Sequence, residues 1–135
     1  RGRYFKWAAH DDVLLPGFLE ACVAALEEST DAALCQSDID YIDEGGSSIG
    51  ARQSHLPGAE SSDPATRFAA LVLRAHDCQA MMGVFRRSVL ERSMLLPSFH
   101  GADRAMLAQV ALLGRYIHVP GALIQVRDHG ERYSR

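Results

Sequence analysis

The chain has 135 residues, of which 47% are hydrophobic and 23% are charged, and its formal net charge is -3. This composition is ordinary for a globular protein, and we expect residues 1–135 to form one domain with its own core. The slight negative charge argues against a nucleic-acid partner, and no apolar run reaches the roughly 20 residues of a membrane span.

The first half of the chain alternates strand-like and helical patterns. Tyr4–Ala9 is short and rich in aromatic residues, as in a buried strand. Apolar residues then recur at helical spacing from Pro16 to Glu28. Ala32–Ile42 has strand character and ends in the turn Asp43–Gly46. Ser47–Ser62 is polar and rich in Gly and Ser, and it predicts a long loop.

The second half begins with a strong helix start, since Asp63 can act as the N-cap and Pro64 as the first helical residue. The expected elements are a helix to about Arg74, a strand at Ala80–Phe85, a short helix at Ser88–Met94, a helix at Asp103–Leu113, and strands at Tyr116–Val119 and Leu123–Val126, followed by a polar tail. Alternating strands and helices predict an α/β protein with a mixed sheet and flanking helices.

Three cysteines are present, and an odd number with no close pair argues against a disulfide framework. Cys22 and Cys35 lie in apolar patterns and are expected in the core. A reducing, cytoplasmic location fits this usage best. The inner face of the membrane is the alternative location.

His10, Asp11 and Asp12 follow the first predicted strand directly. In open α/β sheets, ligands bind outside the carboxyl ends of the strands. Carboxylate oxygens suit Mg²⁺ or Mn²⁺, which then complete their coordination with substrate phosphates. The pattern is thus compatible with a divalent-cation site at Asp11 and Asp12, although on spacing alone it is the less common origin of such a pair. The alternative is a solvated turn with a capping acid for the next helix.

Other polar residues are candidates on weaker patterns. Asp103 begins a helix, where the ionised carboxylate of a general base is favoured, although a plain first-turn acid has the same pattern. Arg127 and His129 follow the last strand and could face phosphate oxygens or belong to a solvated tail. Gly83 indicates close approach of a ligand or of another backbone, with Arg86 and Arg87 beside it.

Several segments together resemble family-2 glycosyltransferases. Gly2–Asp12 followed by Pro16–Leu19 resembles the family's central strand, acidic motif and following helix. Gly83–Leu90 resembles its acceptor-side strand and helix. Gly101–Leu107 with Leu113–Ile117 resembles the segment that carries its catalytic base, and the ending with Arg127 and His129 matches a frequent ending of this domain.

The resemblance implies a role for each matching residue. Asp12 would coordinate the cation, with Asp11 beside it near the ribose and diphosphate. His10 stands where many relatives carry the first Asp of the motif. Asp103 would be the general base, although Ala102 replaces a second acid that many relatives have. The remaining residues implied to contact substrate are Gly83, Arg86, Arg127 and His129.

The resemblance also implies the fold and the reaction. The fold would be a partial GT-A fold, the C-terminal portion of a family-2 domain, without the N-terminal βαβ units that bind the nucleoside. The reaction would be a metal-dependent, inverting transfer of a sugar from a nucleotide-sugar donor to a hydroxyl of a saccharide, lipid or other acceptor. Alone, this portion is expected to be inactive.

Two other classes of function remain open. A histidine/aspartate phosphohydrolase would use His10-Asp11 and His76-Asp77 with Asp103, but that fold is all-helical. A non-catalytic binding module derived from the glycosyltransferase fold is the second alternative. Such a module would expose a sheet edge, and an exposed edge invites self-association.

Overall fold

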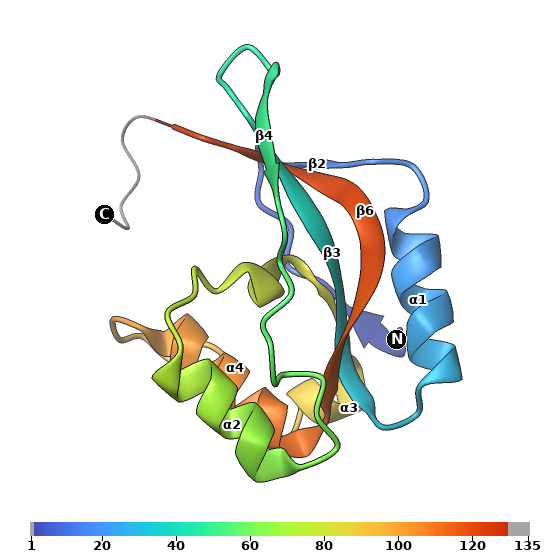
Figure 1. The fold of residues 1–135 in the computed structure, drawn as a ribbon, viewed down its shortest axis with the longest axis vertical. Coiled ribbons are helices and arrows are strands. Elements are labelled where there is room, and N and C mark those ends of the chain that lie inside the picture. Colours follow the sequence, from blue (N-terminus) through green and yellow to red (C-terminus); the bar gives the residue numbers. More distant parts are fainter. Residues whose placement is uncertain (1, 130–135) are drawn as a thin grey trace.

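The computed structural model describes residues 2–129, which form one mixed sheet flanked by helices (Figure 1). In chain order the elements are β1 (Tyr4–Phe5), β2 (Val13–Leu14), α1 (Phe18–Glu28), β3 (Ala32–Ile42), β4 (Ser48–Arg52), α2 (Pro64–Leu73), the 3₁₀ helix η1 (Gln79–Met82), β5 (Val84–Arg86), α3 (Arg87–Leu90), α4 (Ala102–Leu113) and β6 (Arg115–Arg127). The class is α/β, as the alternating patterns predicted.

The two long strands β3 and β6 form the centre of the sheet, whose order is β1-β5-β3-β6-β2, with β4 paired to the second half of β3. β3 and β6 run parallel, from Ala32 opposite Arg115 to Ile42 opposite Arg127, and the other pairs are antiparallel. The carboxyl ends of both central strands therefore lie side by side, and the curled pair is visible in Figure 1.

Each face of the sheet carries its own core. On one face, Phe18, Cys22 and Leu26 of α1 are fully buried at helical spacing against β3. On the other face, α2 and α4 pack together and cover the sheet (Figure 1). Burial of both faces explains why β3 is apolar along most of its length.

The elements predicted from strong local signals are confirmed. Asp63 caps α2, since its Oδ2 accepts a hydrogen bond of 2.8 Å from the backbone N–H of Thr66. β3 has the predicted bounds, and α1 and α4 differ from the predicted helices by one or two residues at their starts. Cys22 and Cys35 are buried, free thiols, as expected.

Other expectations were wrong in part. Ser47–Ser62 is not all loop, because its first residues form β4 on the edge of β3. Of the predicted strand Ala80–Phe85, only the last two residues belong to a strand, β5, which continues to Arg86, since the residues before Gly83 form η1. The two predicted C-terminal strands are one, with Gly121 at φ 94° where the register with β3 shifts.

The first predicted strand is also shorter than expected. Only Tyr4–Phe5 pairs, with β5 at the edge of the sheet, while the following residues run as irregular chain to β2. The predicted polar tail lies mostly outside the described residues. Within residues 2–129, none of the helices combines the length and apolar character that a membrane crossing requires.

Candidate functional site

The acidic segment His10–Asp12 lies between β1 and β2, against the end of β6. Asp12 accepts a hydrogen bond of 3.3 Å at Oδ1 from the backbone N–H of Arg127. The Oδ2 atom of Asp11 contacts Nε2 of His129. The structure thus brings together two pairs of predicted residues that are separated by 115 and 118 positions in the sequence. We call Asp11, Asp12, Arg127 and His129 the carboxylate cluster.

The guanidinium group of Arg127 holds the surrounding loops in place. Its Nη1 donates to the carbonyl oxygens of Asp43 and Glu44, at 2.8 Å each, and its Nε donates to the carbonyl oxygen of Asp11 at 3.4 Å. The backbone N–H of Asp128 donates to Ile42 at 2.8 Å. The turn after β3, the acidic segment and the end of β6 therefore meet at one point.

The electrostatics of the cluster favour ionised Asp11. Its hydrogen bond with His129 holds the pKa of the Asp11 carboxyl below its usual value, and its own backbone N–H and the charge of His10 act in the same direction. His10 lies at the margin, with Nδ1 at 3.7 Å from Oδ1 of Asp11 and a side chain that is 96% exposed.

The cluster supplies too few donor atoms to complete the coordination shell of a cation by itself. Residues 2–129 contain no group of three or more His, Cys, Asp and Glu side chains placed to hold a metal ion. Asp11 and Asp12 nevertheless supply two neighbouring carboxylates beside an arginine. That set fits a magnesium-type site that takes one or two carboxylates from the protein and the remaining ligands from phosphates and water.

Asp103 lies elsewhere, in the first turn of α4, where its Oδ1 accepts a hydrogen bond of 2.8 Å from the backbone N–H of Arg104. It also lies near Cys78: burial, followed by the charge of Asp103, raises the pKa of that thiol to about 11. The next residue, Gln79, donates to the hydroxyl of Tyr41 near the end of β3 at 3.2 Å. No direct contact of Asp103 with the carboxylate cluster is found among the described residues.

Gly83 has a packing role in this structure. A Cβ atom there would lie 2.6 Å from the carbonyl oxygen of Cys35 and would overlap a methyl group of Leu34. Because β5 pairs with β3 at Cys35 and Leu34, only glycine allows this approach of the two backbones. The close partner of Gly83 is therefore another strand.

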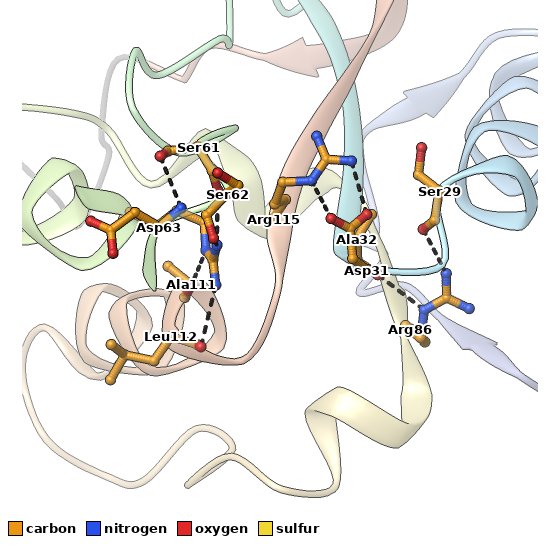
Figure 2. A network of polar contacts seen from close by, with 11 residues as sticks. Ser29, Asp31, Ala32, Ser61, Ser62, Asp63, Arg86, Ala111, Leu112 and Arg115 are labelled. Atoms are coloured by element: carbon orange, nitrogen blue, oxygen red, sulfur yellow. Dashed lines mark hydrogen bonds and ion pairs between the residues drawn. The ribbon is translucent and has the colours of Figure 1, made fainter. Parts of the chain in front are cut away.

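Arg86 is also engaged within the chain. Its guanidinium group donates to the carbonyl oxygen of Leu26 at 2.7 Å, beside the end of α1. It also donates to those of Ser29 and Ala32, at 3.2 and 3.0 Å (Figure 2). β3 has 11 residues, so at about 3.3 Å per residue its two ends lie about 30 Å apart. Arg86 lies at the Ala32 end and Arg127 at the Ile42 end, so the two arginines do not face one ligand.

His76 does not offer a nitrogen for a metal. Its Nδ1 accepts from the backbone N–H of Cys78 at 3.2 Å, and its Nε2 lies 2.9 Å from the carbonyl oxygen of Leu71. With Nδ1 as acceptor, Nε2 carries the proton and donates. Both ring nitrogens are therefore used by the backbone. The strands β3 and β6 likewise contradict the all-helical phosphohydrolase fold.

Sequence reasoning missed a pocket of about 570 Å³ on the side of the sheet that α2 and α4 cover. It lies between the chain after β4, the end of α2 and the chain leading to η1, and it reaches Gln36 on β3. Gln36 and Ser37 are buried polar residues in the middle of β3. Buried polar residues need hydrogen-bond partners. Two adjacent polar residues in the middle of a predicted buried strand were therefore the signal in the sequence that could have indicated this pocket.

The chain was compared with models of protein families and with curated proteins, and neither comparison found a match.

Proposed function

We propose that this chain is the catalytic portion of an inverting glycosyltransferase of the family-2 type, with a GT-A-like sheet. It would transfer a sugar from a nucleotide-sugar donor to the hydroxyl of an acceptor. The observation that supports this most directly is the carboxylate cluster at the carboxyl ends of β3 and β6. Ligands of open α/β sheets bind at such ends.

The cluster has the chemistry to receive a diphosphate. Asp12 and Asp11 would hold a Mg²⁺ or Mn²⁺ ion, which when bound offsets the negative charge that grows on the leaving diphosphate. The guanidinium of Arg127 lies beside the acids and favours an anion there. His129 orients the Asp11 carboxylate through their contact.

Asp103 is our candidate for the general base. Its carboxylate would accept the proton of the acceptor hydroxyl as that oxygen attacks the anomeric carbon. The N-terminal position on α4 fixes the backbone of Asp103, and the nearby Cys78 is a thiol with a raised pKa that stays protonated at neutral pH. Gly83 and Arg86 are not part of this proposal, because their contacts lie within the fold.

Calorimetric titration of UDP with Mn²⁺ tests the donor side of the proposal. We expect weak binding, through the diphosphate alone, that requires Mn²⁺ and that weakens about tenfold or more in Asp12→Asn, because a carboxylate ligand is lost. Glu28→Gln is the matched control, since it removes one exposed carboxylate at the end of α1. Binding that is independent of Mn²⁺, or equal in Asp12→Asn and Glu28→Gln, would contradict the assignment.

A further inference from the structure

The pocket beside Gln36 combines planar polar groups with one apolar wall. Its polar residues come from β3, from the end of β4 and the chain after it, and from the chain between α2 and η1 with the first residue of η1. They include two arginines, one carboxylate and three amides: Arg52, Arg74, Asp77, Gln36, Gln53 and Gln79. Leu71, Ala80 and Tyr116 are buried and form apolar wall. A volume of about 570 Å³ is that of a small-molecule site.

The wall formed by the chain after β4 is fixed. The backbone carbonyl of Ser54 accepts from Nε2 of Gln36 at 2.9 Å, and its N–H donates to Asp38 at 3.2 Å. The Ser54 hydroxyl donates to the carbonyl oxygen of Ser37. Ser54 is consequently buried although it lies outside any regular element. A pocket with such an anchored wall is formed before any ligand arrives.

The floor contains an unsatisfied acceptor. Gln36 is 4% exposed, and its Oε1 is the one buried side-chain polar atom without a hydrogen-bond partner within residues 2–129. A buried carbonyl left without a donor costs about 1–3 kcal/mol. Gln36 lines the pocket, and a shift of its covered Oε1 toward a hydroxyl group of an occupant would offset that cost.

The rim carries positive charge that the described residues do not neutralise. Neither Arg52 nor Arg74 forms an ion pair within the part of the chain that the structure describes, and Arg52 lies over the ring of Tyr41 at 4.9 Å. Asp77 contributes one carboxylate, which can accept from hydroxyls. Two guanidinium groups against one carboxylate favour an occupant that carries an anionic group.

We infer that this pocket binds a saccharide bearing an anionic group, a carboxylate or a phosphate, with Arg52 and Arg74 contacting the anion and Gln36, Gln53 and Asp77 contacting hydroxyls. The pocket adjoins the start of α4, because Arg104, next to Asp103, donates to the carbonyl oxygen of His76 on the pocket wall at 2.7 Å. That this saccharide is the acceptor rests on the proposed function, whereas the binding itself does not.

The test is a titration of the ¹⁵N-labelled chain with glucose 6-phosphate, glucuronate, glucose and inorganic phosphate, without metal or nucleotide. We expect amide shifts around Gln36, Ser54 and Arg74 with at least one anionic sugar. Glucose and phosphate alone should bind about tenfold more weakly, because each supplies half of the contacts. If both anionic sugars cause shifts, the pocket recognises negative charge in general. If only one does, the pocket selects phosphate or carboxylate.

Arg74→Gln and Arg92→Gln form a matched pair, because both arginines are exposed and only Arg74 lines the pocket. We expect Arg74→Gln to bind the anionic sugar about tenfold more weakly, and Arg92→Gln to bind like the unaltered chain. The inference is overturned by equal binding in the two variants, by glucose or phosphate binding as tightly as the anionic sugars, or by no binding at all. If the chain binds an anionic sugar but does not bind UDP with Mn²⁺, the inference about this pocket stands and the proposed transferase function is contradicted.

Discussion

The two ends of β3 both carry arginines, but these arginines have different partners. At the Ala32 end, Arg67 donates to backbone carbonyls. Arg86 there also donates to backbone carbonyls, and Arg115 pairs with the exposed Asp31 (Figure 2). At the Ile42 end, the guanidinium of Arg127 also donates to backbone carbonyls, and its backbone N–H donates to the carboxylate of Asp12, which comes from a distant segment. The two ends thus differ in one respect: only at the Ile42 end does a carboxylate from a distant segment accept a hydrogen bond from the backbone of the strand arginine.

The Ala32 end has a structural explanation. The last carbonyl groups of a helix lack intrahelical partners, and cations near a helix C-terminus are favourable. Arg86 donates to Leu26 and Ser29 at the end of α1, and Arg67 donates to Ala111 and Leu112 at the end of α4. These guanidinium groups complete the helix ends and join them to the sheet.

Replacement of Arg67 should have the largest effect on the molecule. Arg67 is 5% exposed, and its hydrogen bonds go to four carbonyl oxygens, at Ser61, Ser62, Ala111 and Leu112. Arg67→Met would leave these carbonyls without donors and lower the free energy of unfolding by about 3 kcal/mol. Urea denaturation measures the loss, with Arg92→Met as the exposed control. An unchanged midpoint would mean that the helix ends do not depend on Arg67.

The sequence predicted the elements whose signals are local. The cap and proline at Asp63-Pro64 define α2, and the spacing of Phe18, Cys22 and Leu26 defines α1. The prediction failed where the secondary structure depends on pairing with a distant strand. The polar residues of β4 do not favour a strand by themselves, and β4 forms because the edge of β3 is available for pairing.

The candidate site shows the same contrast between local signals and features that depend on strand pairing. Asp11, Asp12, Arg127 and His129 were each proposed from short patterns, but their contacts depend on the antiparallel pairing of β2 with β6, which places Val13 opposite Gln125. Arg86 could not be distinguished from Arg127 in the sequence, since both follow strands. Both guanidinium groups donate to backbone carbonyls, and only the fold brings the Asp12 carboxylate to the backbone N–H of Arg127.

The surroundings of Asp103 can be tested through Cys78. Removal of the negative charge in Asp103→Asn should lower the pKa of Cys78 from about 11, so the thiolate fraction at pH 8 rises and iodoacetamide reacts several-fold faster. Asp77→Asn is the matched control and should have a smaller effect, because the charge of Asp77 raises this pKa less. Cys22 and Cys35 are buried and should not react in the folded chain. Equal iodoacetamide rates in the two variants would mean that the charge of Asp103 does not act on Cys78 more strongly than that of Asp77.

The smallest expected effects concern one carboxylate at each end of β3. The hydrogen bond from Arg115 lowers the pKa of Asp31, and the hydrogen bond with His129 lowers that of Asp11, both from 3.8. A lowered folded pKa means that each pair contributes stability above about pH 3.8, which is lost as the pH falls through the folded value. Carboxyl ¹³C NMR titration should therefore show both groups ionising below pH 3.8. Arg115→Gln should raise only the pKa of Asp31, and His129→Gln only that of Asp11. A shift of both carboxyls in either variant would mean that the two ends, about 30 Å apart along β3, are not independent.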